Sequence, residues 1–109
     1  MNRLLMYTRD RTCPDQELAR RCLAEFNVPY TEISISHEPD AAQIVLELVG
    51  CLAMPTLLIA DEANNPIEPP QPIEPYQSVR NVDRGSIISE PSRVGLQQFL
   101  IRNGLLPAA

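Results

Sequence analysis

The sequence contains no tryptophan and no lysine, and aromatic residues make up only 5% of its 109 residues. A hydrophobic core must therefore be built mainly from leucine, isoleucine and valine. No apolar run approaches the roughly 20 residues that a membrane-spanning helix needs, and the apolar run near the N-terminus is too short for the core of a signal peptide. We therefore expect a cytoplasmic protein that does not associate with membranes.

Basic charge is scarce overall and concentrated near the N-terminus. The formal net charge is −5 and the isoelectric point is near 4.7, which argues against a nucleic-acid-binding protein because such proteins need a basic footprint on the phosphates. Most of the arginines in the chain nevertheless fall within its first fifth: Arg3, Arg9, Arg11, Arg20 and Arg21. This local patch favours a small anionic ligand.

The chain has three cysteines, Cys13, Cys22 and Cys51, and a single histidine, His37. An odd number of cysteines without an export signal makes a disulfide framework improbable. The spacings match no zinc pattern, and His37 lies far from any pair of cysteines in the sequence. We expect no metal site and no permanently bound cofactor.

The first half of the chain has the pattern of a strand, a helix and a second strand. Residues 4–7 form a short apolar run that is typical of a strand buried on both faces. Thr12 is a suitable N-cap and Pro14 is favoured in the first turn of a helix. Apolar residues then recur at helical spacing, at Leu18, Ala19, Cys22, Leu23 and Phe26. Residues 30–36 alternate between apolar and polar, which predicts a strand.

The second half predicts a helix, two strands and a last helix. A helix opens at residues 37–40 and stops at Gly50. Residues 53–60 are a continuous apolar strand with a proline near its head, where proline is tolerated. Residues 85–89 form a last short strand, and Ser89 is a candidate N-cap for a final helix that ends at Asn103-Gly104.

The predicted order is β-α-β-α-β-β-α, which is the order of the thioredoxin-like fold. It is an α/β fold with a mixed four-stranded sheet flanked by helices. We expect one domain over residues 1–109, in which residues 62–84, the Pro-rich segment, form an insertion between strands 3 and 4.

The Pro-rich segment repeats the tetrapeptide Pro-Ile-Glu-Pro, and its prolines recur every third residue at Pro66, Pro69, Pro72 and Pro75. Such a period matches one edge of a polyproline II helix. The segment is then either a docking element for an aromatic-lined groove or a stiff, enlarged hairpin loop. In the second interpretation it covers the sheet edge or packs on a second copy of the chain.

Cys13 stands where the first predicted helix begins. The free N–H groups and the positive end of the helix dipole favour a thiolate there, and Arg9 and Arg11 add to that field. A thiolate is the nucleophilic form of cysteine. Asp15 opposes the effect unless its carboxylate points away. The alternative is a surface cysteine that merely lies in a turn.

Several short motifs together resemble the glutaredoxin family. They are Tyr7-Thr8-Arg9 with Thr12-Cys13-Pro14, then Val28-Pro29-Tyr30-Thr31-Glu32-Ile33, then Met54-Pro55-Thr56. They match the active-site loop, the second strand and the cis-proline strand of that family. The ending Ile87-Ile88-Ser89-Glu90-Pro91-Ser92 is similar to the mycoredoxin-like branch, which has a Pro-Ser helix start in place of paired glycines.

The resemblance implies that Cys13 is the nucleophile, that Pro55 is cis, and that the Met54 backbone pairs with an extended thiol substrate. We expect the substrate to be bound by residues of the loop, the proline strand and the last helix start: Arg9, Arg11, Thr12, Pro14, Met54, Pro55, Ser89 and Ser92. Ser89 and Ser92 would help to hold a ligand carboxylate.

The motif at the site is Cys-Pro-Asp-Gln, so Gln16 stands where the family has its resolving cysteine. A dithiol cycle then needs another thiol. Cys22 lies on the apolar face of its helix and is expected in the core. Cys51, four residues before Pro55, is the one candidate for a second redox thiol.

The leading hypothesis is a monothiol thiol–disulfide oxidoreductase. Its co-substrate would be a low-molecular-weight thiol such as glutathione, and its substrates would be mixed disulfides on proteins. One alternative is an iron–sulfur carrier, in which Cys13 from two chains and two small thiols hold a cluster. Another is a non-catalytic binding module. The sequence leaves open which thiol is used, the target protein and the oligomeric state, a homodimer included.

Overall fold

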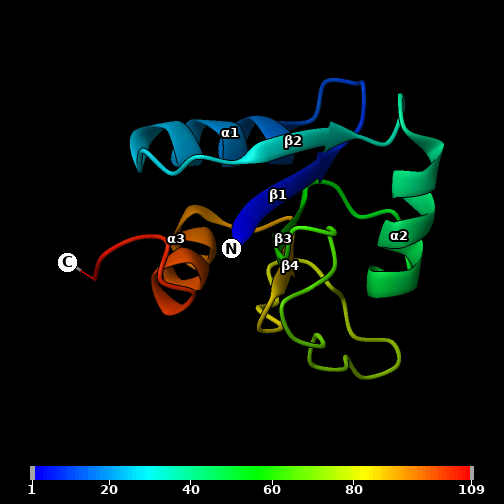
Figure 1. The fold of residues 1–109 in the computed structure, drawn as a ribbon. Helices are drawn as coiled ribbons and strands as arrows, with labels where there is room; N and C mark the ends of the chain where they lie inside the picture. Colours follow the sequence, from blue (N-terminus) through cyan, green and yellow to red (C-terminus); the bar gives the residue numbers. More distant parts are fainter. Residues whose placement is uncertain (1, 109) are drawn as a thin grey trace.

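The computed structural model describes residues 2–108, which form a four-stranded sheet with helices on both faces (Figure 1). The order of elements is the predicted one, and the architecture is a thioredoxin-like fold. The elements are β1 (Arg3–Thr8), α1 (Pro14–Glu25), β2 (Thr31–Ser34), α2 (Pro39–Val49), β3 (Thr56–Ala60), β4 (Ile87–Ser89) and α3 (Arg93–Arg102).

The strands lie in the order β2-β1-β3-β4, with β1 parallel to β2 and antiparallel to β3. β4 pairs antiparallel with β3 at the edge of the sheet. Tyr7, near the end of β1, lies opposite Thr56, the first residue of β3. The loop that follows β1 and the loop that precedes β3 therefore meet at one end of the sheet. This register brings the region of Cys13 close to the region of Pro55.

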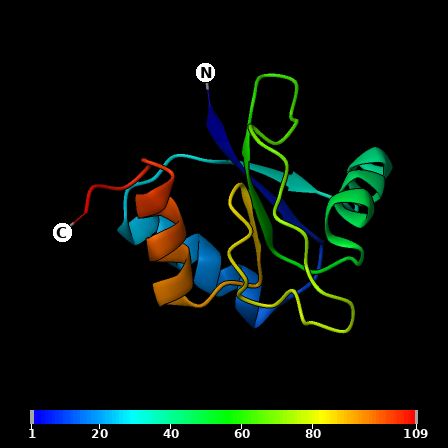
Figure 2. The same ribbon diagram turned by 90° about the horizontal axis from the view of Figure 1, so that it is seen from below.

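The two faces of the sheet carry separate hydrophobic clusters. Helices α1 and α3 cover one face, and α2 covers the other (Figure 2). Because side chains alternate along a strand, Leu4 and Met6 of β1 pack under α1 and α3, whereas Leu5 and Tyr7 pack under α2. All four side chains are buried, as expected for a central strand.

Two helix starts differ from those predicted. α1 has Cys13, not Thr12, as its N-cap, because Cys13 is the last extended residue (φ −146°, ψ 118°) before Pro14. Its side chain makes no capping hydrogen bond. α3 has Ser92, not Ser89, as its N-cap, and the Ser92 hydroxyl accepts a hydrogen bond from the Gly95 N–H. Ser89 still belongs to β4, so the helix cannot begin beside it.

The Pro-rich segment folds back on the sheet at both of its ends. After a turn over residues 61–65, the Ile67 N–H donates to the Ile59 carbonyl of β3. Farther on, the Asn81 N–H donates to the Ser89 carbonyl and the Arg84 N–H to the Ile87 carbonyl, both on β4. Its return path thus covers part of the free edge of β4, which an uncovered sheet would leave open to pairing.

None of the helices within residues 2–108 has the length and apolar character required to cross a bilayer.

Candidate functional site

Cys13 lines a cavity of about 320 Å³ at the end of the sheet where β1 stops and β3 starts. Cys13 is partly exposed and is not in a disulfide. The cavity is lined by residues from the loop before α1, from the loop before β3 and from the end of β4: Arg9, Arg11, Thr12, Cys13, Pro14, Leu52, Met54 and Glu90. Every residue predicted from the loop around Cys13, and Met54 as well, lies in this wall.

Gln16 holds the loop that carries the two arginines. Its side chain is 0% exposed. Its amide oxygen accepts from the Arg9 N–H at 2.9 Å, and its amide nitrogen donates to the carbonyls of Arg9 and Arg11 at 3.2 and 3.4 Å. The residue at the resolving-cysteine position therefore has a structural role. Its spacing of three residues from Ala19, on the buried helix face, is the sequence signal that indicates burial.

The peptide bond between Met54 and Pro55 is cis. Thr56, the next residue, anchors this turn because its buried hydroxyl donates to the Ala53 carbonyl at 2.7 Å. That donation uses the single hydroxyl proton of Thr56, so the Ser89 hydroxyl donates to Thr56 Oγ1, also at 2.7 Å. The wall of the cavity opposite α1 is thus held by buried hydrogen bonds.

Ser89 and Ser92 do not reach the cavity. Ser89 is buried against Thr56, and Ser92 caps α3 while its N–H donates to the Asn81 side-chain oxygen at 2.9 Å. Both hydroxyls serve the fold. Pro55 is buried and is not among the residues that line the cavity. Its carbonyl accepts a hydrogen bond from the N–H of the lining residue Glu90 at 2.8 Å.

Glu90 and Leu52 are wall residues that the sequence did not indicate. Glu90 follows β4 with a left-handed backbone (φ +46°), a conformation uncommon for a residue other than glycine. The hydrogen bond from the Glu90 N–H to the Pro55 carbonyl stabilises this backbone conformation. The Leu52 carbonyl accepts a hydrogen bond from the Arg9 guanidinium.

The two arginines of the loop have different surroundings. Arg9 is bonded to the Leu52 carbonyl and so links the loop before α1 to the loop before β3. Arg11 is exposed, and within residues 2–108 no hydrogen bond or ion pair holds its guanidinium. Arg9 therefore links the two loops, whereas the Arg11 guanidinium is exposed in the wall of the cavity.

Asp15 does not leave an unbalanced negative charge beside Cys13. Its carboxylate receives two hydrogen bonds from the Arg80 guanidinium, at 2.7 and 2.9 Å. These bonds lower the pKa of the Asp15 carboxyl below its ordinary value. Arg80 also lies 3.5 Å from a carboxylate oxygen of Glu90. Arg80 belongs to the Pro-rich segment, far along the chain, so no local pattern could have identified the pairing.

The other two cysteines lie elsewhere. Cys22 is buried in the cluster beneath α1 and α3, as its helical position predicts. Cys51 is exposed, and it is not among the residues that line the cavity of Cys13. A role for Cys51 as a second redox thiol stays a prediction.

A comparison with protein-family models matches the part of the chain that contains Cys13, Met54 and Pro55. The family model described as glutaredoxin matches residues 4–63, more than half of the chain. The chain belongs to the glutaredoxin family. The matched region runs from β1 to the turn after β3 and includes Cys13, Met54 and Pro55. Glutaredoxins are in general thiol–disulfide oxidoreductases that use glutathione-type thiols. No individual curated protein and no solved structure matched the chain.

Proposed function

We propose that this glutaredoxin acts as a monothiol oxidoreductase in which Cys13 removes a small thiol from mixed disulfides. The observation that carries the proposal is the placement of a partly exposed cysteine in the wall of a cavity, next to Met54 and two arginines. A helix start whose N-cap side chain makes no hydrogen bond adds support, because its N–H groups and dipole favour a thiolate.

The reaction would run in two exchange steps. In the first, the Cys13 thiolate attacks the small-thiol sulfur of a protein mixed disulfide, a Cys13–small-thiol disulfide forms, and the protein leaves as a thiolate that takes up a proton. In the second, another molecule of the small thiol attacks that disulfide as its thiolate. This step releases the oxidised small-thiol dimer and regenerates the Cys13 thiolate.

The charges of the wall favour a small thiol that carries a carboxylate, as glutathione does. Arg11 is an exposed cation in the wall, whereas the Glu90 carboxylate lies 3.5 Å from Arg80. We assign Arg11 to the ligand carboxylate and the Met54 backbone to the extended part of the ligand. Gln16 fills the place of a resolving cysteine, which supports a cycle through one thiol.

We also propose that residues 1–109 act as one glutaredoxin domain in which the Pro-rich segment is an insertion between β3 and β4. The hydrogen bonds of this segment to both strands, and the Asp15–Arg80 pair, support that description.

The direct test is a steady-state assay with a glutathionylated peptide and reduced glutathione. Wild type should release the peptide thiol, and Cys13→Ser should be inactive. Cys51→Ser is the matched control and should keep the wild-type rate, because Cys51 is not in the wall. Arg11→Ala should raise KM with little change in kcat, since it removes binding of the ligand and not the nucleophile. Equal rates for wild type and Cys13→Ser would refute the proposal.

A further inference from the structure

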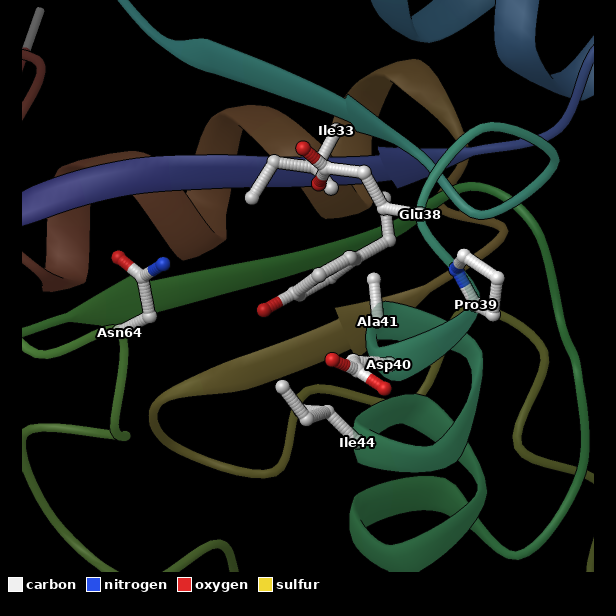
Figure 3. Close-up of a pocket in the computed structure, with 8 residues that line it drawn as sticks. Ile33, Glu38, Pro39, Asp40, Ala41, Ile44 and Asn64 are labelled. Carbon is white, nitrogen blue, oxygen red and sulfur yellow. The ribbon is translucent and has the colours of Figure 1, made fainter.

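A second cavity, of about 340 Å³, lies on the α2 face of the sheet. It shares no lining residue with the cavity of Cys13. Figure 3 shows Asp40, Ala41 and Ile44 on the α2 side of this cavity and Asn64 across from them, on the loop that follows β3. Its volume is at the lower end of the range of small-molecule sites, about 300–1,000 Å³.

Two polar atoms in this wall are buried and unused. The hydroxyl of Tyr7, a residue 1% exposed, has no hydrogen-bond partner within the described part of the chain. The side-chain oxygen of Asn64 is in the same situation. Buried polar groups are nearly always paired, and leaving one unpaired is costly. Two such groups in one cavity indicate that its occupant is polar.

The Asn64 side is fixed by a local turn. The Asp61 carboxylate accepts the N–H groups of Ala63 and Asn65, and the Asn64 N–H donates to the Asp61 carbonyl. Asn64 itself has a left-handed backbone (φ +66°), which asparagine tolerates better than most residues. The unpaired oxygen is therefore presented by an ordered loop.

The remaining walls define the chemistry of the occupant. Glu38 and Asp40 contribute carboxylates to the wall, and neither carboxylate forms an ion pair with any other residue in the described part of the chain. Ile33, Ala41 and Ile44 are apolar, and among residues 2–108 no basic residue lines the cavity. Burial raises the pKa of the Tyr7 hydroxyl, Arg3 opposes that shift, and Glu38 adds to it. The hydroxyl thus stays protonated near neutral pH, with an oxygen lone pair available to a donor.

We propose that this cavity binds a small organic cation, an ammonium or guanidinium group on a short apolar stem. The cation would donate to Tyr7 Oη, to the Asn64 oxygen and to the carboxylates of Glu38 and Asp40. The stem would lie against the isoleucines. Within the described wall, oxygen acceptors without a competing cation favour a positively charged head group with several N–H donors, and the isoleucines favour an apolar stem.

The experiment is a calorimetric titration of the full-length protein with n-butylguanidinium, compared with n-butanol and butyrate. We expect saturable binding of the cation and none of the other two compounds. Tyr7→Phe should weaken binding about tenfold or more, the loss that accompanies a hydrogen bond to a charged group. Tyr76→Phe, at a fully exposed tyrosine, is the matched control and should bind like wild type.

Folding of the variants is checked by thermal melting. Tyr7→Phe keeps the ring and removes only the unpaired hydroxyl, so its Tm without ligand should equal or exceed that of wild type. Binding should also persist in Cys13→Ser, because the two cavities are separate. Butylguanidinium that binds no better than butanol, or equally well to Tyr7→Phe, would overturn the proposal, as would binding of butyrate.

Discussion

Gln16→Glu is the substitution that tests most sharply how the loop before Cys13 is held. The two side chains have nearly the same shape, so packing is preserved, but the amide nitrogen becomes an oxygen. That oxygen would face the carbonyls of Arg9 and Arg11, which now accept from the amide at 3.2 and 3.4 Å. The bond from the Arg9 N–H would remain.

The expected cost is about 3 kcal/mol at pH 7. Two hydrogen bonds are lost, each of which contributes about 0.5–1.5 kcal/mol, and a charge is introduced at a residue that is 0% exposed. Burial and the two carbonyls favour the protonated form of the new carboxyl and so raise its pKa in the folded state. A raised folded-state pKa means that stability falls as pH rises above the unfolded value, about 4.3. The cost should therefore be smaller at pH 4.5 than at pH 7.

Urea denaturation at both pH values measures this cost, and Gln98→Glu on the exposed face of α3 is the matched control. The control should change the free energy of unfolding by less than about 0.5 kcal/mol. If Gln16→Glu were no more destabilising at pH 7 than the control, the amide could not be what orders the loop.

Three further outcomes follow from the hydrogen bonds and ion pairs. Thr56→Val should lower the free energy of unfolding by about 2–3 kcal/mol, because it leaves both the Ala53 carbonyl and the buried Ser89 hydroxyl unpaired. Ser89→Ala removes one hydrogen bond and should cost about 1 kcal/mol. Equal costs for the two variants would contradict the assigned donors. Glu32→Gln should cost about 1 kcal/mol at pH 7, since Glu32 accepts two bonds from Arg20, which lower its carboxyl pKa. Because the folded-state pKa of Glu32 is lowered, its stabilising contribution is lost as pH falls from the unfolded value, about 4.3, through the folded-state pKa. The difference from wild type should therefore shrink as pH falls below about 4, and a difference that stays constant there would contradict the ion pair. Arg80→Ala should speed amide hydrogen exchange in the Pro-rich segment and leave exchange in β1 unchanged, because it removes the pair with Asp15. If the exchange rates of the Pro-rich segment did not change, the Asp15–Arg80 pair could not be what orders this segment.

The sequence was sufficient for the central framework of the fold. Residues 4–7 are apolar without interruption because β1 is covered on both faces, and this pattern identifies a central strand. The first helix was located by its periodic apolar face and by Pro14 at its start. Both signals are local, and both are strong because burial dictates them. Cys13 could be placed at a helix start for the same reason.

What the sequence could not give depends on contacts between distant segments. Asp15 appears in the sequence as a charge that opposes a thiolate, and only the folded chain shows that Arg80 pairs with it. Ser92 and Ser89 appear as free hydroxyls beside a helix start, but capping and a buried bond to Thr56 occupy them. The prolines of the Pro-rich segment recur every third residue, but this period does not distinguish a docking element from a loop that covers the sheet edge. The sequence also could not show that Arg80 of this segment reaches Asp15.

The most direct test of the whole account is to find where a small thiol attaches. Wild-type protein treated with oxidised glutathione, quenched with acid and mapped by peptide mass spectrometry should carry one glutathionyl group on Cys13, and added reduced glutathione should remove it. The adduct should form on Cys51→Ser at the wild-type rate. Modification of Cys51 with none at Cys13, or an adduct on Cys13 that reduced glutathione cannot remove, would contradict a reaction through the Cys13 thiol.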